Sequence, residues 1–100
     1  MWVISRKRLV EASQRHGDVR APLDAWFRIA KRADWKNLDD IRKTWARTDR
    51  FGRCTIFDIK GNEYRLIVWV NFRSQKIFIR NVLTHAEYDR EGWKHDCTRD

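Results

Sequence analysis

The sequence has few residues that interrupt or crosslink a chain: of its 100 residues, one is proline, four are glycine and two are cysteine. So little proline and glycine, beside 42% hydrophobic residues, argues against intrinsic disorder, because enough apolar area is available to offset the entropy of the chain. No apolar run approaches the roughly 20 residues that span a bilayer, and no signal-peptide core follows the first basic residues. We therefore expect a folded, cytoplasmic protein with no membrane partner.

The cysteines, Cys54 and Cys97, are too few for a disulfide framework and form no CxxC zinc pattern. In a reducing compartment we expect both to stay thiols. His85, His95 and Asp96 supply no tight ligand pair such as HxxxH, so we predict no metal site and no cofactor. A Walker loop, a GxGxxG turn and a Ser-centred elbow are also missing, which leaves nucleotide hydrolysis and acyl transfer without support.

Positive charge is what the sequence has in excess. Lys and Arg number 22 against 14 Asp and Glu, which gives a formal net charge of +8. The balance is +7 over residues 1–53, +4 over residues 60–80 and −2 over residues 81–100. An excess of this size predicts a polyanionic partner such as nucleic acid.

The length is that of one small domain, so we assign residues 1–100 to a single domain, with residues 93–100 as a candidate flexible tail. Residues 2–4 are a candidate short strand. Helical spacing of apolar residues predicts helices over residues 5–15, with Ser5 as N-cap, and from Pro22 to about residue 34. Asn37 is suited to cap a third, short helix that reaches about Trp45.

After Gly52 the pattern changes to β-rich runs, which predict strands over residues 54–59, 64–72 and 76–83. A turn at Gly61-Asn62 and a short connection at residues 73–75 favour an antiparallel meander. Alternation in the middle strand places on one face Tyr64, Leu66, Val68, Val70 and Phe72, and on the other Arg65, Ile67, Trp69, Asn71 and Arg73. Helices on the apolar face of a twisted antiparallel sheet make an α+β, two-layer domain.

Chemistry is concentrated after the last strand, where His85 and Tyr88 stand close together in the sequence. Cleavage of RNA through its own 2′-hydroxyl needs a base, an acid for the leaving 5′-oxygen, and cations for the charge on phosphorus. Histidine titrates near neutrality and suits either proton transfer. The candidate catalytic residues are Arg65, His85, Tyr88 and Lys60, and the candidate RNA contacts are Arg80, Arg73, Trp69 and Lys76.

Each of these residues also has an ordinary structural role to weigh. A histidine after a strand is commonly a surface or capping residue, and an arginine in a strand is commonly solvated or salt-bridged. Tyr88 is suited to packing with a hydrogen-bonded hydroxyl. Trp69 is suited to covering the sheet, although an exposed indole beside arginine is also a platform on which bases stack.

Several sequence blocks together resemble the HigB family of bacterial type II toxins, within the RelE-like superfamily of mRNA interferases. The likeness spans roughly residues 1–97, and the GNEYRL and THAEYD blocks at their mutual spacing are its most specific part. The matching blocks are Trp26-Phe27, residues 33–37, residues 57–66, Ile79-Arg80, residues 84–89 and residues 92–94.

The resemblance implies a RelE/ParE-like fold and a toxin that cleaves mRNA in the ribosomal A site. It also implies a helix-turn-helix antitoxin of the HigA type as partner. By position, Arg65 resembles the arginine that stabilises transition-state charge, and His85 resembles the acid or base, supported by Tyr88 and Lys60. RelE itself has paired lysines on the strand that here carries Cys54, Ile56 and Asp58, so the general base stays unassigned.

Two other functions fit the same surface. A non-catalytic RNA- or ribosome-binding module needs only the basic face, and its binding would weaken with salt as it would for an enzyme. A toxin of the related gyrase-poisoning branch would share the fold, but it would leave His85 and Tyr88 without a catalytic task. We therefore take an endoribonuclease as the leading hypothesis.

Overall fold

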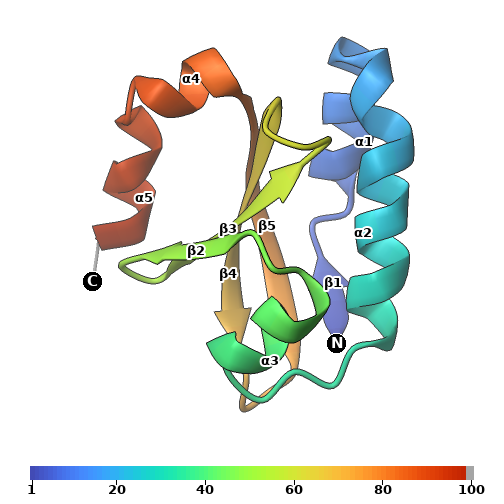
Figure 1. Cartoon of the computed structure of the whole chain (residues 1–100), viewed down its shortest axis with the longest axis vertical. Coiled ribbons are helices and arrows are strands. Elements are labelled where there is room, and N and C mark those ends of the chain that lie inside the picture. Colours follow the sequence, from blue (N-terminus) through green and yellow to red (C-terminus); the bar gives the residue numbers. More distant parts are fainter. Residues whose placement is uncertain (99–100) are drawn as a thin grey trace.

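A five-stranded sheet forms the centre of the computed structural model, which describes residues 1–98 (Figure 1). The strands lie in the order β1-β5-β4-β3-β2. In chain order the elements are β1 (Trp2–Ile4), α1 (Lys7–Arg15), η1 (Gly17–Val19), α2 (Arg20–Arg32), α3 (Leu38–Thr44), β2 (Thr48–Phe51), β3 (Cys54–Ile59), β4 (Tyr64–Asn71), β5 (Lys76–Thr84), α4 (His85–Asp89), η2 (Gly92–Lys94) and α5 (His95–Thr98).

The sheet is mixed rather than wholly antiparallel. Strands β2 to β5 form the expected antiparallel meander, but β1 runs parallel to β5, with Trp2 opposite Lys76 and Ile4 opposite Phe78. Parallel neighbours require a long connection, and here α1, α2 and α3 carry the chain from the β1 edge of the sheet to the β2 edge, from which β2, β3 and β4 return it to β5. The α+β class is confirmed, and the expectation of a purely antiparallel sheet is wrong at this one edge.

Helices α1 and α2 cover one face of the sheet and enclose the main core (Figure 1). Leu66 and Val68 of β4 are fully buried there, as their alternation predicts. Trp26 of α2 packs edge-on against Phe57 of β3 with ring centroids 5.3 Å apart, and both side chains are fully buried. Aromatic pairs of this geometry stabilise the fold by more than the apolar area that they bury accounts for.

The helix starts differ from the predicted ones at the first two helices. Ser5 is not an N-cap, because its φ of 70° places it in the left-handed region, and α1 begins at Lys7 with no side-chain cap. Helix α2 begins at Arg20, so Pro22 lies in the first turn, where the missing amide hydrogen has no intrahelical acceptor. None of the helices described for residues 1–98 has the length and hydropathy needed to cross a membrane.

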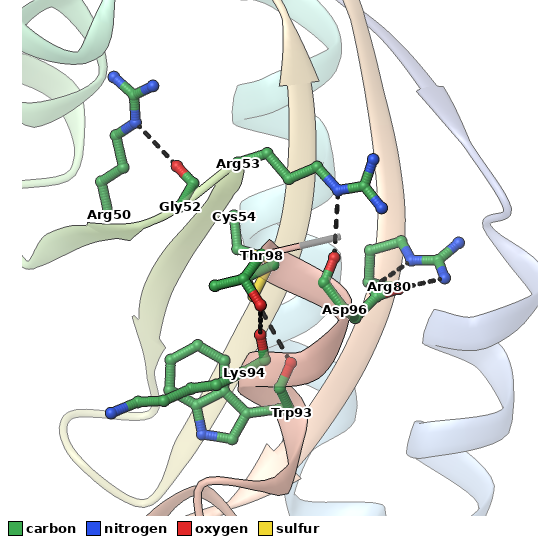
Figure 2. Close-up of a disulfide and its surroundings, with 10 residues drawn as sticks. Arg50, Gly52, Arg53, Cys54, Arg80, Trp93, Lys94, Asp96 and Thr98 are labelled. Carbon is green, nitrogen blue, oxygen red and sulfur yellow. Dashed lines mark hydrogen bonds and ion pairs between the residues drawn. A yellow bond between two sulfur atoms is a disulfide. The ribbon is translucent and has the colours of Figure 1, made fainter. Parts of the chain in front are cut away.

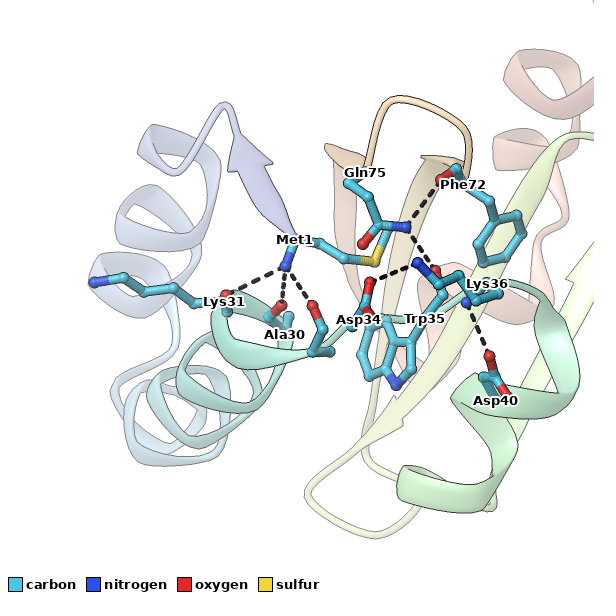
Figure 3. Close-up of polar contacts among 10 residues, drawn as sticks. Met1, Ala30, Lys31, Asp34, Trp35, Lys36, Asp40, Phe72 and Gln75 are labelled. Atoms are coloured by element: carbon cyan, nitrogen blue, oxygen red, sulfur yellow. Dashed lines mark hydrogen bonds and ion pairs between the residues drawn. The ribbon is translucent and has the colours of Figure 1, made fainter.

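The amino terminus ties β1 to the end of α2 (Figure 3). The Met1 ammonium donates to the carbonyl oxygens of Ala30, Lys31 and Ala33 at 3.1, 3.2 and 2.7 Å. A positive group is favourable at the carboxyl end of a helix, where carbonyl groups lack intrahelical partners. This contact fixes the edge strand against the helical layer.

Helix α3 has the predicted cap. The Asn37 side chain accepts a hydrogen bond from the Asp40 amide at 2.9 Å. Asn37→Ala is expected to lower the free energy of unfolding by about 1 kcal/mol, because that amide loses its acceptor. Urea denaturation measures the change. Asn37→Asp keeps an acceptor and should stay near the wild type, and equal destabilisation by both variants would contradict the capping role.

Strand β2 and the carboxyl-terminal helices were not predicted. Residues 93–98, expected to be a candidate flexible tail, instead form η2 and α5 and pack on the face of the sheet opposite α1 and α2 (Figure 1). The rest of that tail, residues 99–100, lies outside the described residues. A second, smaller core results, whose buried members are Cys54, Ile56, Ile67, Trp93 and Cys97.

Cys54 at the start of β3 and Cys97 in α5 form a disulfide, so the prediction of two free thiols is wrong (Figure 2). They are 43 residues apart in sequence, and the fold-back of α5 over β3 brings their Cα atoms to 5.1 Å. Gly52 permits this approach, because a Cβ at that position would collide with the Cys97 carbonyl group. The second face of the sheet is therefore partly covered.

Candidate active site

The start of α4 lies against the β3–β4 hairpin. Thr84 and Glu87 form a capping box, in which each side chain accepts from the other residue's amide, at 3.2 and 2.9 Å. The His85 amide donates to the Glu63 carbonyl at 2.9 Å. The hydrogen bond from the Thr84 amide, above other causes, lowers the pKa of the Glu87 carboxyl. The hairpin that carries Lys60 and the helix that carries His85 are thus joined directly.

Arg65 is buried in β4, directly opposite Asp58 of β3. Its Nε lies 3.1 Å from Asp58 Oδ1, Nη1 donates to the carbonyls of Asn62 and Tyr64 at 3.0 and 3.3 Å, and Nη2 donates to the Asn62 side chain. The guanidinium thus makes three hydrogen bonds and one ion pair within the protein. Arg65 is therefore a fixed cation whose charge is largely engaged by its neighbours.

Tyr88 of α4 lies between Arg65 and Trp93. The Arg65 guanidinium carbon is 4.9 Å from the centroid of the tyrosine ring, and the Trp93 ring stacks on Tyr88 at 4.8 Å with an interplanar angle of 10°. Burial, together with the negative charge of Asp49, raises the pKa of the Tyr88 hydroxyl. The phenol is consequently a proton donor or hydrogen-bond donor at neutral pH.

His85 is the first residue of α4 and its side chain is half exposed. Its Nε2 lies 3.3 Å from Asp89 Oδ2, one helical turn further on. A carboxylate at this distance orients the imidazole. His85 is thus accessible, oriented, and on the same helix as Tyr88.

Lys60 is held by two carboxylates. Its Nζ lies 2.9 Å from Asp18 Oδ2 and 3.0 Å from Glu63 Oε2, and these hydrogen bonds raise its pKa. Asp18 also accepts from the Tyr64 hydroxyl at 2.6 Å, and this bond, followed by that from Lys60, lowers the pKa of the Asp18 carboxyl. Lys60 therefore remains charged, but its ammonium group is already paired with two carboxylates.

Two of the predicted RNA contacts, Arg80 and Trp69, meet on the second face of the sheet, where Figure 2 shows Arg80 beside Asp96. Arg80 is the extra residue of a β-bulge, since Ile79 pairs with Val68 and Asn81 with Ile67. The guanidinium carbon of Arg80 lies 3.9 Å from the Trp69 ring centroid, and its nitrogens bind Asp96 at 2.7 and 2.9 Å. These two residues face α5 rather than open solvent.

The other two predicted RNA contacts lie at the far end of the β4–β5 hairpin. Tyr64 pairs with Thr84 at the end next to His85, whereas Asn71 pairs with Lys76 at the opposite end. Arg73 is exposed in the turn between those strands. Lys76 lies over the exposed Trp2 ring, with Nζ 5.6 Å from the ring centroid. The structure does not bring Arg73 and Lys76 to His85.

Sequence reasoning missed residues around Tyr88. A groove of about 310 Å³ lies between β2 and α4–η2, and it adds carboxylates and cations beside Tyr88. Its lining includes Asp49, Arg50, Asp89, Glu91 and Lys94. No signal in the sequence marked the β2 residues, because that strand lacks apolar alternation. Within residues 1–98, no group of three or more His, Cys, Asp or Glu side chains is placed to hold a metal ion.

The geometry defines a small cationic α+β domain with an exposed histidine, a tyrosine and a fixed arginine at one end of its sheet. A model of the HigB toxin family, described as the RelE-like toxic component of a toxin–antitoxin system, matches residues 19–91. The chain therefore belongs to the HigB toxin family, as its sequence blocks indicate, and membership implies an antitoxin partner.

Curated relatives agree with this assignment. The mRNA interferase HigB of Escherichia coli O6:H1 is 26% identical over 93 residues, which cover 90% of both chains. The mRNA interferase toxin HigB of Escherichia coli K12 is 30% identical over 92 residues, covering 89% of this chain and 88% of that protein. The mRNA interferase HigB of Shigella flexneri gives the same values.

Proposed function

We propose that this toxin is an mRNA interferase, an endoribonuclease that cleaves translated mRNA in the ribosomal A site in the cytoplasm. The observation that carries the proposal is the placement of His85, Tyr88 and Arg65 at the junction of α4 with the β3–β4 hairpin. An accessible acid or base, a phenol and a fixed cation are what cleavage through a 2′-hydroxyl requires. The names of the curated relatives support the same activity.

In this proposal His85 transfers one of the two protons, and Asp89 holds its imidazole at 3.3 Å. The 2′-oxygen attacks phosphorus, its proton passes to a base, and the departing 5′-oxygen takes a proton from an acid. Arg65 offers positive charge to the phosphoryl oxygens. Tyr88 acts as a hydrogen-bond or proton donor, and Lys60 adds a cation at the hairpin.

Expression of the protein in bacterial cells tests this proposal. Expression of the wild type is expected to arrest growth, with new 5′ ends inside open reading frames in primer-extension maps. Co-expression of a HigA-type helix-turn-helix protein encoded beside the toxin gene should restore growth. Growth arrest without cleaved messages would reject the nuclease and leave the toxin assignment intact.

A non-catalytic RNA- or ribosome-binding module is the second candidate. One observation favours it: the candidate catalytic cations Arg65 and Lys60 already have intramolecular partners, so little of their charge is free to stabilise the charge that develops on phosphorus during cleavage. Purified protein added to translating ribosomes separates the two functions. Intact message bound to stalled ribosomes indicates a binder, whereas cleaved message indicates the enzyme.

A further inference from the structure

Residues 93–98 hold the second face of the sheet through polar contacts as well as the disulfide (Figure 2). The Arg53 amide donates to the Cys97 carbonyl at 2.9 Å, and Arg53 Nε donates to the Asp96 carbonyl at 3.1 Å. The Asp96 carboxylate accepts from Nε and Nη2 of Arg80 at 2.7 and 2.9 Å. The segment thus places one carboxylate in the fork of one arginine.

The groups beneath that carboxylate have the chemistry of a site for nucleic acid. Guanidinium carbons of Arg53 and Arg80 each lie 3.9 Å from the Trp69 ring centroid. A two-pronged arginine contact fits a phosphate as well as it fits a carboxylate. The two guanidinium groups lie over opposite faces of the Trp69 ring, so the indole holds both arginines in place by cation–π contacts.

We propose that Arg53 and Arg80, positioned by Trp69, form a binding site for a phosphodiester group of single-stranded RNA, which Asp96 blocks while the Cys54–Cys97 disulfide is closed. The inference rests on RNA being the substrate of this toxin. Asp96 and Cys97 lie outside residues 19–91, the part of the chain that matches the family model.

Opening the site takes one two-electron reduction by a cellular dithiol. A thiolate of the dithiol attacks one sulfur of the disulfide, and its second thiol resolves the mixed disulfide. The dithiol is oxidised to a disulfide, and Cys54 and Cys97 each gain a hydrogen. Both sulfur-bearing residues are buried, at 0% and 2% exposure, so the dithiol reaches them only when α5 opens locally.

Once the disulfide is reduced, only weak non-covalent contacts hold α5 on the sheet. It has four residues, too few to be stable as an isolated helix. The Arg80–Asp96 pair is partly solvated, with side chains 29% and 21% exposed. A phosphate chain brings several charges and therefore competes with the single carboxylate of Asp96 for the arginines.

Fluorescence anisotropy with a labelled single-stranded RNA of 2′-O-methyl nucleotides tests the proposal. The oxidised protein is expected to bind weakly, and the dithiothreitol-treated protein and Cys54→Ser/Cys97→Ser about tenfold more tightly, roughly the contribution of one hydrogen bond to a charged group. Oxidised Asp96→Asn should also bind more tightly. Asp24 is exposed on α2, and Asp24→Asn makes the same charge change there, so it should leave affinity near that of the wild type.

Equal affinity in the oxidised and reduced proteins would overturn the proposal, as would a gain that survives Arg80→Gln in the double-serine protein. Hydrogen exchange gives a second measurement, in which reduction raises exchange at residues 93–98 and leaves β4 protected. Unchanged protection of residues 93–98 would contradict the opening. The 2′-O-methyl probe cannot be cleaved, so it reports binding only. Redox-dependent binding of this probe, with no cleavage of ordinary message, would reject the nuclease function and leave the binding site intact.

Discussion

His85→Ala is expected to slow mRNA cleavage by about 10²- to 10⁴-fold, the usual contribution of a positioned acid or base. The side chain is half exposed, and the contacts that fix the start of α4 use the backbone of residue 85 and the side chains of its neighbours. The fold should therefore survive the substitution. Single-turnover cleavage of a message on purified translating ribosomes measures the effect.

His95→Ala is the matched control, because His95 is exposed on α5 and has no part in the candidate site. It should cleave at the wild-type rate. Cleavage by His85→Ala within a few-fold of the wild type would remove His85 from the catalytic step. Tyr88→Phe then becomes the informative variant, since it keeps the ring stack with Arg65 and Trp93 and removes only the hydroxyl.

Loss of the disulfide is expected to lower the free energy of unfolding by about 4 kcal/mol, because the crosslink closes a loop of 43 residues and so restricts the unfolded chain. That is a large fraction of the roughly 5–15 kcal/mol that stabilises an ordinary domain. Urea denaturation of the wild type with and without dithiothreitol measures the difference. Cys54→Ser/Cys97→Ser should match the reduced wild type and show no response to dithiothreitol.

An identical midpoint for oxidised and reduced wild type would show that the crosslink does not constrain the unfolded chain. Partial loss, with β4 still protected from hydrogen exchange, would place the effect in α5 alone. Either result would separate the stability of the whole domain from the attachment of its last helix.

The sequence predicted the parts of the fold that depend on local pattern. Asn37 caps α3 because an Asx side chain suits that position whatever surrounds it. The alternation in β4 predicted that Leu66 and Val68 would face the helices, and the structure confirms it. Family membership, indicated by the sequence blocks, is confirmed by the family match over residues 19–91.

Features set by contacts between distant segments could not be predicted. Asp58 faces Arg65 only because of the β3–β4 register, so no local pattern indicates that the guanidinium is already paired within the protein. The bulge at Arg80 likewise depends on two strands together. The disulfide was not predicted, because a reducing compartment favours free thiols and nothing local in the sequence places the two cysteines together. The fold-back of α5 brings Cys54 and Cys97 into contact.

If this toxin cleaves RNA by attack of the 2′-hydroxyl, removing that hydroxyl at the cleavage position must block the reaction. A message carrying a single 2′-deoxynucleotide at the mapped cleavage position is compared with the all-ribose message on translating ribosomes. The proposed chemistry predicts that the deoxy message stays intact and that the all-ribose message yields fragments with 5′-hydroxyl ends. Cleavage of the deoxy message at the same position, or fragments with 5′-phosphate ends, would contradict it.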